Sequence, residues 1–429
     1  MLSRRELLEI TLGTGATLAL TPALLRALEQ SNGKLIQRAI PSSGEMLPVI
    51  SFGARPADPA AIKAVLKTLV DNGGRVADVL HGGPAGEHGA RTAANELGVQ
   101  NKLFWTTPLG VMVPLLPGHD GPPPKSDAAT VKAAMEEKFA TFKVKKIDLV
   151  QVLAHADVPT HLAVLREMKK EGRVRYIGVT DLAPPPNVKT STPFYGNLES
   201  IMRNESVDFI GVDYSVGDRR VEEKILPLAQ ERKIGVMAYF PFDRSRIFQR
   251  ASSTPLPEWA ADFDAKTWAQ FFLKYVISHP AVIVARAGTT KAAHMLDNIG
   301  GGIGRLPNEA TRKRMAELVD ALPPTPPPKP PSQPKAAQES AVVLSAATLD
   351  RYVGEYKYAA VGTVVTVRRD GDRLLVKSGT MPEGLAVARS DTRFSAPWGA
   401  PIEFQLDDQG KVTGAIVEQG PFRIALERK

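Results

Sequence analysis

Cysteine is absent from this 429-residue chain. The protein therefore has no disulfide, no thiolate nucleophile and no cysteine-ligated zinc. The absence also suits an oxidising compartment, where an unpaired thiol is readily oxidised. Chemistry that depends on a thiolate is excluded.

Long apolar runs are lacking as well, and none after the first residues is long enough to span a bilayer. The chain opens with Ser3-Arg4-Arg5-Glu6-Leu7-Leu8 and continues into a short apolar stretch over residues 10–25. Adjacent arginines before such a stretch are typical of a twin-arginine export signal, so residues 1–35 predict a periplasmic or exported protein. The alternative is an ordinary amphipathic helix. A membrane tether is expected only if the segment stays uncleaved.

The net charge is +8, but lysine and arginine are dispersed among a similar number of acidic residues. Neither a zinc-finger spacing nor an RNA-binding signature is present. We therefore expect solvated charged surfaces and no nucleic-acid partner. The expected partner is a small-molecule substrate.

Short apolar runs alternate with helical patterns over residues 39–322. Ile147–Leu153 is typical of a buried strand, whereas residues 60–72 have helical periodicity and end at a glycine pair. Repeated β–α units of this number and span predict an α/β fold, specifically a closed (β/α)8 TIM barrel. No G-x-G-x-x-G follows an early strand, so the other common dinucleotide-binding fold is not expected.

A proline-rich linker is predicted for residues 323–341, because such a run cannot lie inside a helix or sheet. Residues 342–429 then contain short β-type runs separated by tight turns, which predict a small antiparallel all-β domain. This domain resembles those appended to secreted bacterial hydrolases. Its aromatic residues are expected to form a core, with ligand binding as the alternative.

Several stretches of residues 39–322 resemble aldo/keto reductases. The most specific is Lys170-Glu171-Gly172-Arg173-Val174-Arg175-Tyr176-Ile177-Gly178-Val179-Thr180. Residues 147–152, residues 235–239 and the loop that starts at Gly288 resemble three further segments of that family. The resemblance implies an oxidoreductase that transfers hydride between NADP or NAD and a carbonyl or alcohol substrate.

The resemblance also implies a proton relay of tyrosine, lysine, aspartate and histidine. Asp78 stands at the aspartate position. The other three positions hold Gly83, Pro108 and Leu153, whose side chains neither donate a proton nor adjust a pKa. The family's relay therefore cannot operate unchanged.

The implied cofactor site is altered too. Thr180 and Asp181 stand where the family binds the nicotinamide amide, although asparagine is usual at the second position, and Gly211 replaces a glutamine. Tyr239 is expected to stack on the nicotinamide. The adenosine phosphate would be held by a loop and the helix after it: Gly288, Thr289, Thr290, Lys291 and Asn298.

Two histidines lie beside the lost positions and are candidate replacements. His81 follows Asp78 by three residues, and His155 follows Leu153 by two. Imidazole titrates near neutral pH and can act as an acid or a base. Exposed loop histidines are the alternative, and no metal site is expected.

Three functions remain open. The first is a divergent exported oxidoreductase with bound NAD(P). The second is a non-redox lyase or hydrolase that uses an Asp–His pair on the same barrel. The third is a ligand-binding protein that has lost catalysis, because a fold does not fix a function.

Overall fold

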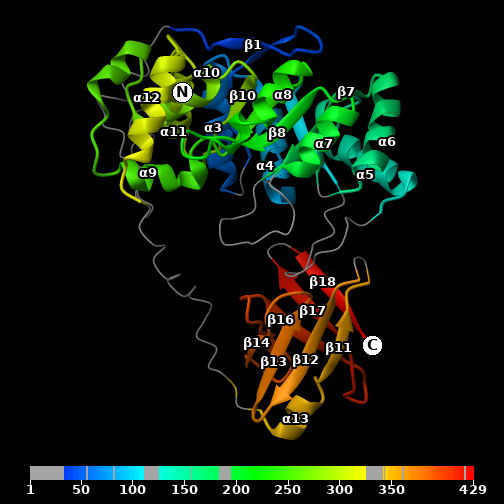
Figure 1. Ribbon diagram of the computed structural model, residues 1–429. Helices are drawn as coiled ribbons and strands as arrows, with labels where there is room; N and C mark the ends of the chain where they lie inside the picture. The colour runs from blue at the N-terminus through cyan, green and yellow to red at the C-terminus, as the bar shows by residue number, and fades with distance from the viewer. Residues whose placement is uncertain are drawn as a thin grey trace. The chain divides into compact units, whose positions relative to one another are not determined.

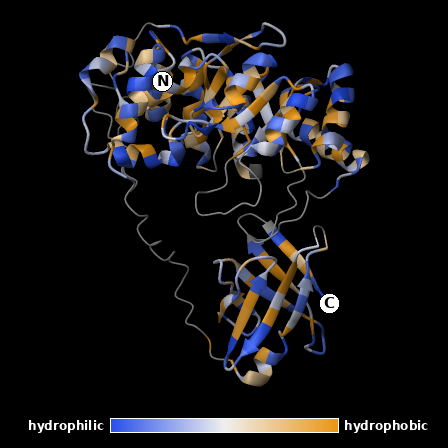
Figure 2. Ribbon diagram, viewed as in Figure 1, coloured by the Kyte–Doolittle hydropathy of each residue, from blue (hydrophilic) through white to orange (hydrophobic). Residues whose placement is uncertain are grey.

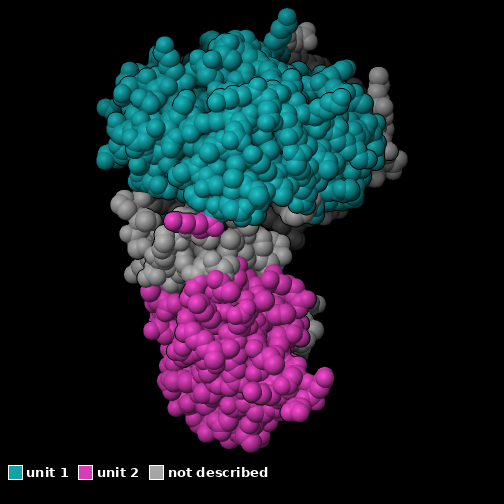
Figure 3. Space-filling view, turned by 90° about the vertical axis from the view of Figure 1, so that its right-hand side faces the viewer, with its two compact units in different colours: residues 1–110, 126–327 teal, residues 111–125, 328–429 magenta. Residues whose placement is uncertain are grey.

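The computed structural model describes residues 33–54, 57–80, 83–110, 125–154, 156–182, 195–324, 342, 344–359, 362–419 and 422–429. The chain divides into two compact units: residues 1–110 with 126–327 form the first, and residues 111–125 with 328–429 form the second (Figure 3). Most of the proposed export signal, most of the proline-rich linker, His81 and His155 lie outside the described residues.

The first unit is a closed barrel of eight parallel strands in the order β10-β3-β4-β5-β6-β7-β8-β9 (Figure 1). The predicted TIM barrel is therefore confirmed. The strands are β3 Ile50–Gly53, β4 Val76–Asp78, β5 Phe104–Leu109, β6 Ile147–Leu153, β7 Val174–Asp181, β8 Phe209–Asp213, β9 Gly235–Tyr239 and β10 Val282–Arg286.

Helices surround these strands and carry hydrophobic and hydrophilic residues side by side (Figure 2). Such a pattern is expected of a layer with one face on a sheet and the other in solvent. Side-chain caps begin some of them: Asp127 accepts from the Thr130 amide and Asn308 from the Thr311 amide. The α-helices of this unit are α3 Pro59–Asp71, α4 Gly83–Glu96, α5 Ala128–Phe142, α6 Val158–Lys170, α7 Gly196–Asn204, α8 Ile225–Glu231, α9 Arg246–Ala251, α10 Trp268–Ser278, α11 Ala292–Gly301 and α12 Glu309–Asp320. Short 3-10 turns lie at Gln100–Lys102, Arg220–Glu222, Asp243–Ser245 and Glu258–Phe263.

The inside of the barrel changes from apolar to polar along the strands. Val76, Phe104 and Leu149 belong to the apolar interior cluster near the strand starts. Two residues further along the same strands stand Asp78, Thr106 and Gln151. Since side chains two apart share a face of a strand, the polar layer lies nearer the C-terminal rim.

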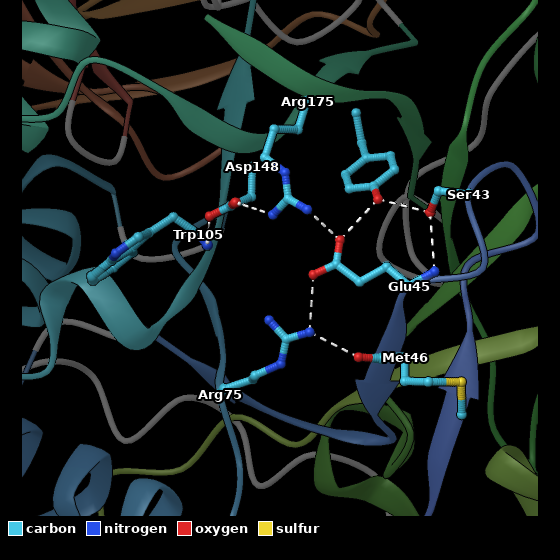
Figure 4. Close-up of polar contacts among 8 residues, drawn as sticks. Ser43, Glu45, Met46, Arg75, Trp105, Asp148 and Arg175 are labelled. Carbon is cyan, nitrogen blue, oxygen red and sulfur yellow. Dashed lines mark hydrogen bonds and ion pairs between the residues drawn. The ribbon is translucent and has the colours of Figure 1, made fainter. Parts of the chain in front are cut away.

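A two-stranded hairpin, β1 Gln37–Ala39 and β2 Met46–Pro48, places Glu45 beside the strand starts (Figure 4). The Glu45 carboxylate contacts Arg175, accepts from Arg75 Nη2 at 3.0 Å and accepts from the Tyr176 hydroxyl at 2.8 Å. Arg175 also donates to Asp148 at 2.7 Å. These charge-assisted bonds fix the hairpin on the N-terminal end of the barrel and leave the opposite end for chemistry.

The second unit is a closed antiparallel barrel in which each strand pairs with the next and β11 pairs with β18. The predicted all-β domain is therefore confirmed. Its elements are α13 Ala346–Asp350, β11 Gly354–Lys357, β12 Val364–Asp370, β13 Arg373–Ser378, β14 Gly384–Ala388, β15 Arg393–Ser395, β16 Pro401–Leu406, β17 Val412–Gln419 and β18 Phe422–Arg428.

Aromatic side chains fill this second barrel. Tyr352, Tyr356, Phe394 and Phe404 are at most 3% exposed, and their rings contact one another. The expectation that the aromatics form a core is met by these four residues. None of the described helices in either unit is both long and apolar enough to cross a membrane.

Candidate active site

A polar network fills the barrel near the C-terminal ends of its strands, which is where TIM-barrel enzymes carry their active sites. Six side chains from six strands form it, and none is more than 4% exposed. They are Asp78, Thr106, Gln151, Thr180, Tyr239 and Arg286.

Asp78, at the end of β4, is the centre of this network. Its Oδ1 accepts from Arg286 Nε at 2.7 Å and from the Leu80 amide at 3.2 Å. Its Oδ2 accepts from the Tyr239 hydroxyl at 2.8 Å and from Thr106 Oγ1 at 3.2 Å. Burial of an unpaired carboxylate would cost free energy. The cation and the three neutral donors around Asp78 offset this cost.

Gln151, on β6, joins the remaining members. Its Nε2 donates to Thr106 Oγ1 at 2.9 Å and to the Tyr239 hydroxyl at 2.7 Å. Its Oε1 accepts from Thr180 Oγ1 at 2.6 Å. A fully bonded buried network of this kind is rigid.

Tyr239, at the end of β9, is fully buried, and its hydroxyl donates to Asp78. Burial, followed by the charge of Asp78, raises the pKa of Tyr239 well above its ordinary value. The phenol therefore stays protonated. Its expected stacking on a nicotinamide stays a prediction, since the ring has no exposed face in this structure.

A strained loop after β9 adds a second group at the rim. Four of its non-glycine residues have positive φ: Phe240 (49°), Asp243 (48°), Arg244 (51°) and Ser245 (71°). Arg244 forms an ion pair with the buried Asp213 at 2.8 Å, and its guanidinium lies 4.0 Å from the centroid of the Phe240 ring. Strain of this kind is concentrated at functional sites. Sequence reasoning missed Arg244, because a loop conformation of this type has no simple residue signature.

The loop between β10 and α11 holds the other predicted cofactor residues. Thr289 Oγ1 accepts from the Lys291 amide at 3.1 Å, and Lys291 precedes the first turn of α11. Asn298 is buried and donates to the Ala287 carbonyl at 3.4 Å. The loop thus presents a cation and a helix N-terminus at one point, which is a favourable environment for an anion.

The segment from residue 51 to residue 313 matches the model of the aldo/keto reductase family. The chain belongs to the aldo/keto reductase family. Residues 338–427 match a second model, described as a domain of unknown function, DUF3471.

Individual relatives are distant. The chain is 24% identical over 222 residues to the probable aldo-keto reductase 1 of Glycine max and 25% identical over 197 residues to the uncharacterized oxidoreductase YqkF of Bacillus subtilis (strain 168). These matches cover 45% and 40% of this chain but only 60% of either relative.

Solved structures agree on the fold. An aldo-keto reductase from Klebsiella pneumoniae in complex with NADPH superposes with a TM-score of 0.51 at 19% identity, over 69% of this chain and 97% of that one. The holo form of AKR11C1 from Bacillus halodurans gives the same score and identity, over 66% and 96%. At this identity the likeness concerns the fold alone.

Arg286 is the cation that contacts Asp78 in this structure. Pro108, on β5, stands at the expected lysine position, and Arg286 donates to Asp78 from β10 on the other side of the sheet order. The Arg286 side chain is therefore buried inside the barrel beside Asp78.

Gly211 explains how Tyr239 reaches Asp78. A Cβ placed on Gly211 would lie 2.6 Å from Tyr239 Cε2, 2.6 Å from Thr180 Oγ1 and 2.9 Å from Gln151 Oε1. A glutamine, which the family resemblance implies at position 211, would therefore collide with all three side chains. The volume freed by glycine is occupied by the tyrosine ring and its hydrogen-bond partners.

Two further predicted positions can be located. Leu153 is 7% exposed at the end of β6, and Gly83 begins α4. Neither brings a proton donor to the interior network. The replacement roles of His81 and His155 stay predictions, because both residues lie outside the described part of the chain.

Asp181, the last residue of β7, has an unusual environment at the rim. Burial raises its pKa from 3.8 to about 6. Between these pH values the folded state holds the proton more tightly than the unfolded chain. Ionisation of Asp181 therefore lowers the free energy of unfolding as the pH rises from about 4 to about 6, and the full loss is present above pH 6.

We expect Asp181→Asn to raise the free energy of unfolding by about 2 kcal/mol at pH 8 and to change it little at pH 4. Urea unfolding at both pH values measures the difference, with Asp262→Asn, an exposed aspartate of the same unit, as control. An equal gain at both pH values would contradict the assignment of the cost to a buried charge.

Proposed function

We propose that the chain is an exported, divergent oxidoreductase that binds NADP or NAD at the C-terminal rim of its barrel and acts on a carbonyl or alcohol substrate. The observation that carries this proposal is the convergence of Asp181, Arg244 and the loop of residues 288–291 on the same end of the barrel strands, in a member of the aldo/keto reductase family. The structure with NADPH from Klebsiella pneumoniae gives the cofactor class.

The residues present fit a dinucleotide at the phosphate end. Lys291 supplies a cation, and α11 supplies free amides at its N-terminus, so this loop would hold the adenosine phosphate. At the nicotinamide end, the Asp181 carboxylate can accept a hydrogen bond from a carboxamide, whereas Thr180 already donates to Gln151. A bound nicotinamide would supply or accept the hydride.

The chain's own residues define what remains of the proton chemistry. Asp78 is saturated by four donors and is not free to act as a base. Tyr239 is held protonated, and its hydroxyl donates to Asp78. We therefore assign proton transfer to His81 or His155, which flank the ends of β4 and β6 in sequence.

The saturated state of Asp78 also weakens the alternative of a lyase or hydrolase with an Asp–His pair. It favours the other alternative, a ligand-binding protein without turnover, because the Gln151 amide and the Tyr239 hydroxyl are already hydrogen-bonded without a substrate. Turnover of bound cofactor with carbonyl substrates distinguishes this second candidate from an oxidoreductase.

Export by the twin-arginine route is part of the proposal, because that route carries folded proteins and a cofactor bound before transport would be retained. The second unit is proposed to be an accessory module of the kind found in secreted proteins. Fractionation of cells that produce the chain with Arg4 and Arg5 replaced by lysine tests the route, since export is then expected to stop.

Cofactor binding is tested on the purified full chain by fluorescence titration with NADPH and NADH. We expect Lys291→Ala to weaken NADPH binding about ten-fold, because a charge-assisted contact to phosphate contributes about 1.5–3 kcal/mol at most. Lys313→Ala, an exposed lysine on α12, is the control. Absence of binding by either nucleotide would refute the oxidoreductase and leave the ligand-binding protein.

A further inference from the structure

Arg286 has one donor that the interior network does not use. Its Nε donates to Asp78 at 2.7 Å and its Nη2 to the Ala54 carbonyl at 2.8 Å. Its Nη1 makes no hydrogen bond within the described part of the chain. The residue is only 4% exposed, so this is a donor held almost inside the barrel without an acceptor among the described residues.

Two glycines lie against this donor. A Cβ on Gly288 would lie 3.0 Å from Nη1, and a Cβ on Gly53 would lie 3.0 Å from Nη1 and 2.7 Å from Cζ. Gly53 ends β3, and Gly288 follows β10 by two residues, so both stand at the C-terminal rim. Any larger residue at either place would cover the guanidinium.

The charge around this donor selects the kind of ligand. Asp78 neutralises Arg286, and its carboxylate would repel an incoming anion across a poorly hydrated space. A neutral carbonyl oxygen meets no such repulsion and gains a hydrogen bond from a charged donor. A donor fixed in this way also stabilises negative charge that develops on the oxygen.

We propose that Arg286 recognises the carbonyl oxygen of the substrate through Nη1, in place of the groups lost at residues 83 and 153. The proposal deepens the function proposed above, because it names the residue that selects a ketone or aldehyde over a carboxylate. Asp78 positions the guanidinium and does not touch the substrate.

The test compares Gly288→Ala with Gly217→Ala in the full chain. The first substitution puts a methyl group against Nη1, and neither glycine has a positive φ that alanine would strain. The second is a matched control on another loop, where the new Cβ would lie an ordinary 3.6 Å from Ile247. Binding of acetone, cyclohexanone and acetophenone is measured by calorimetry without cofactor, with cyclohexanecarboxylate as the anionic comparison.

We expect at least one ketone to bind ten-fold more tightly than the carboxylate. Gly288→Ala should lower the affinity for that ketone at least ten-fold, whereas Gly217→Ala should leave this affinity unchanged. Arg286→Lys, which keeps the charge but loses the planar fork, should weaken it similarly if the variant folds. Equal ketone affinity in Gly288→Ala and the parent chain would overturn the proposal, as would failure of all three ketones to bind the parent chain.

NADPH titration of the same proteins separates this inference from the proposed function. Ketone binding that depends on residue 288 without any NADPH binding would support Arg286 and refute the oxidoreductase. NADPH binding, together with a ketone affinity that is the same in Gly288→Ala and the parent chain, would support the oxidoreductase and refute the role of Arg286.

Discussion

Arg286→Met is expected to lower the free energy of unfolding of the barrel unit by about 3–5 kcal/mol. The substitution removes the cation that contacts Asp78 and leaves a carboxylate with no solvent exposure at all. Tyr239, Thr106 and the Leu80 amide still donate to it, but none carries a charge. Hydrogen exchange of peptides from β4 and β10 measures the loss in the barrel unit separately from the second unit.

The double variant Asp78→Asn/Arg286→Met is the control. It removes both charges together, and replacement of a whole buried ion pair by groups of similar volume is often neutral. We expect it to recover most of the stability lost in the single variant. If the double variant were as unstable as Arg286→Met alone, the cost would come from lost packing and not from an unpaired charge.

The barrel itself was readable from the sequence because each strand is a buried apolar run. Ile147–Leu153 was predicted with the bounds that the structure gives to β6. In the second unit, β11 and β14 are harder to recognise from the sequence. Both are short and begin with glycine, which weakens a strand pattern.

Asp78 was also readable, since a carboxylate at the end of a buried strand needs a partner. The identity of that partner was not. Arg286 is separated from Asp78 by 208 residues and Tyr239 by 161, and the contacts depend on closure of the barrel. One signal was available: an arginine that ends an apolar strand and is itself buried requires a counter-ion inside the fold.

The glycine at position 211 and the side chains around Asp78 depend on one another. Pro108 stands where a lysine is expected, and Gly211 stands where a glutamine is expected. A Cβ at Gly211 would meet Thr180, Tyr239 and Gln151, which belong to the hydrogen-bond network around Asp78. A guanidinium from β10 and a phenol from β9 now occupy the space around Asp78. The room left by Gly211 is therefore coupled to the hydrogen bonds of Tyr239 with Asp78 and Gln151.

Gly211→Gln is the direct test of this coupling, and we expect it to destabilise the barrel unit by about 3 kcal/mol. The new Cβ alone would lie 2.6 Å from Tyr239 and from Thr180, closer than side chains approach one another, and both neighbours are buried. Tyr239 cannot give way without leaving Asp78, because its hydroxyl is bonded both to Asp78 and to Gln151. Hydrogen exchange of β8 and β9 peptides follows the loss.

Gly110→Ala serves as the matched control, since its Cβ would meet Leu153 at an ordinary 3.5 Å. A second variant, Gly211→Gln/Tyr239→Ala, removes the ring that the glutamine displaces and should recover part of the stability, because the added volume then has a place to go. If Gly211→Gln were no less stable than Gly110→Ala, then the packing of Tyr239 over Gly211 would not hold the network together. The loss of the glutamine would then be unrelated to the contact between Tyr239 and Asp78.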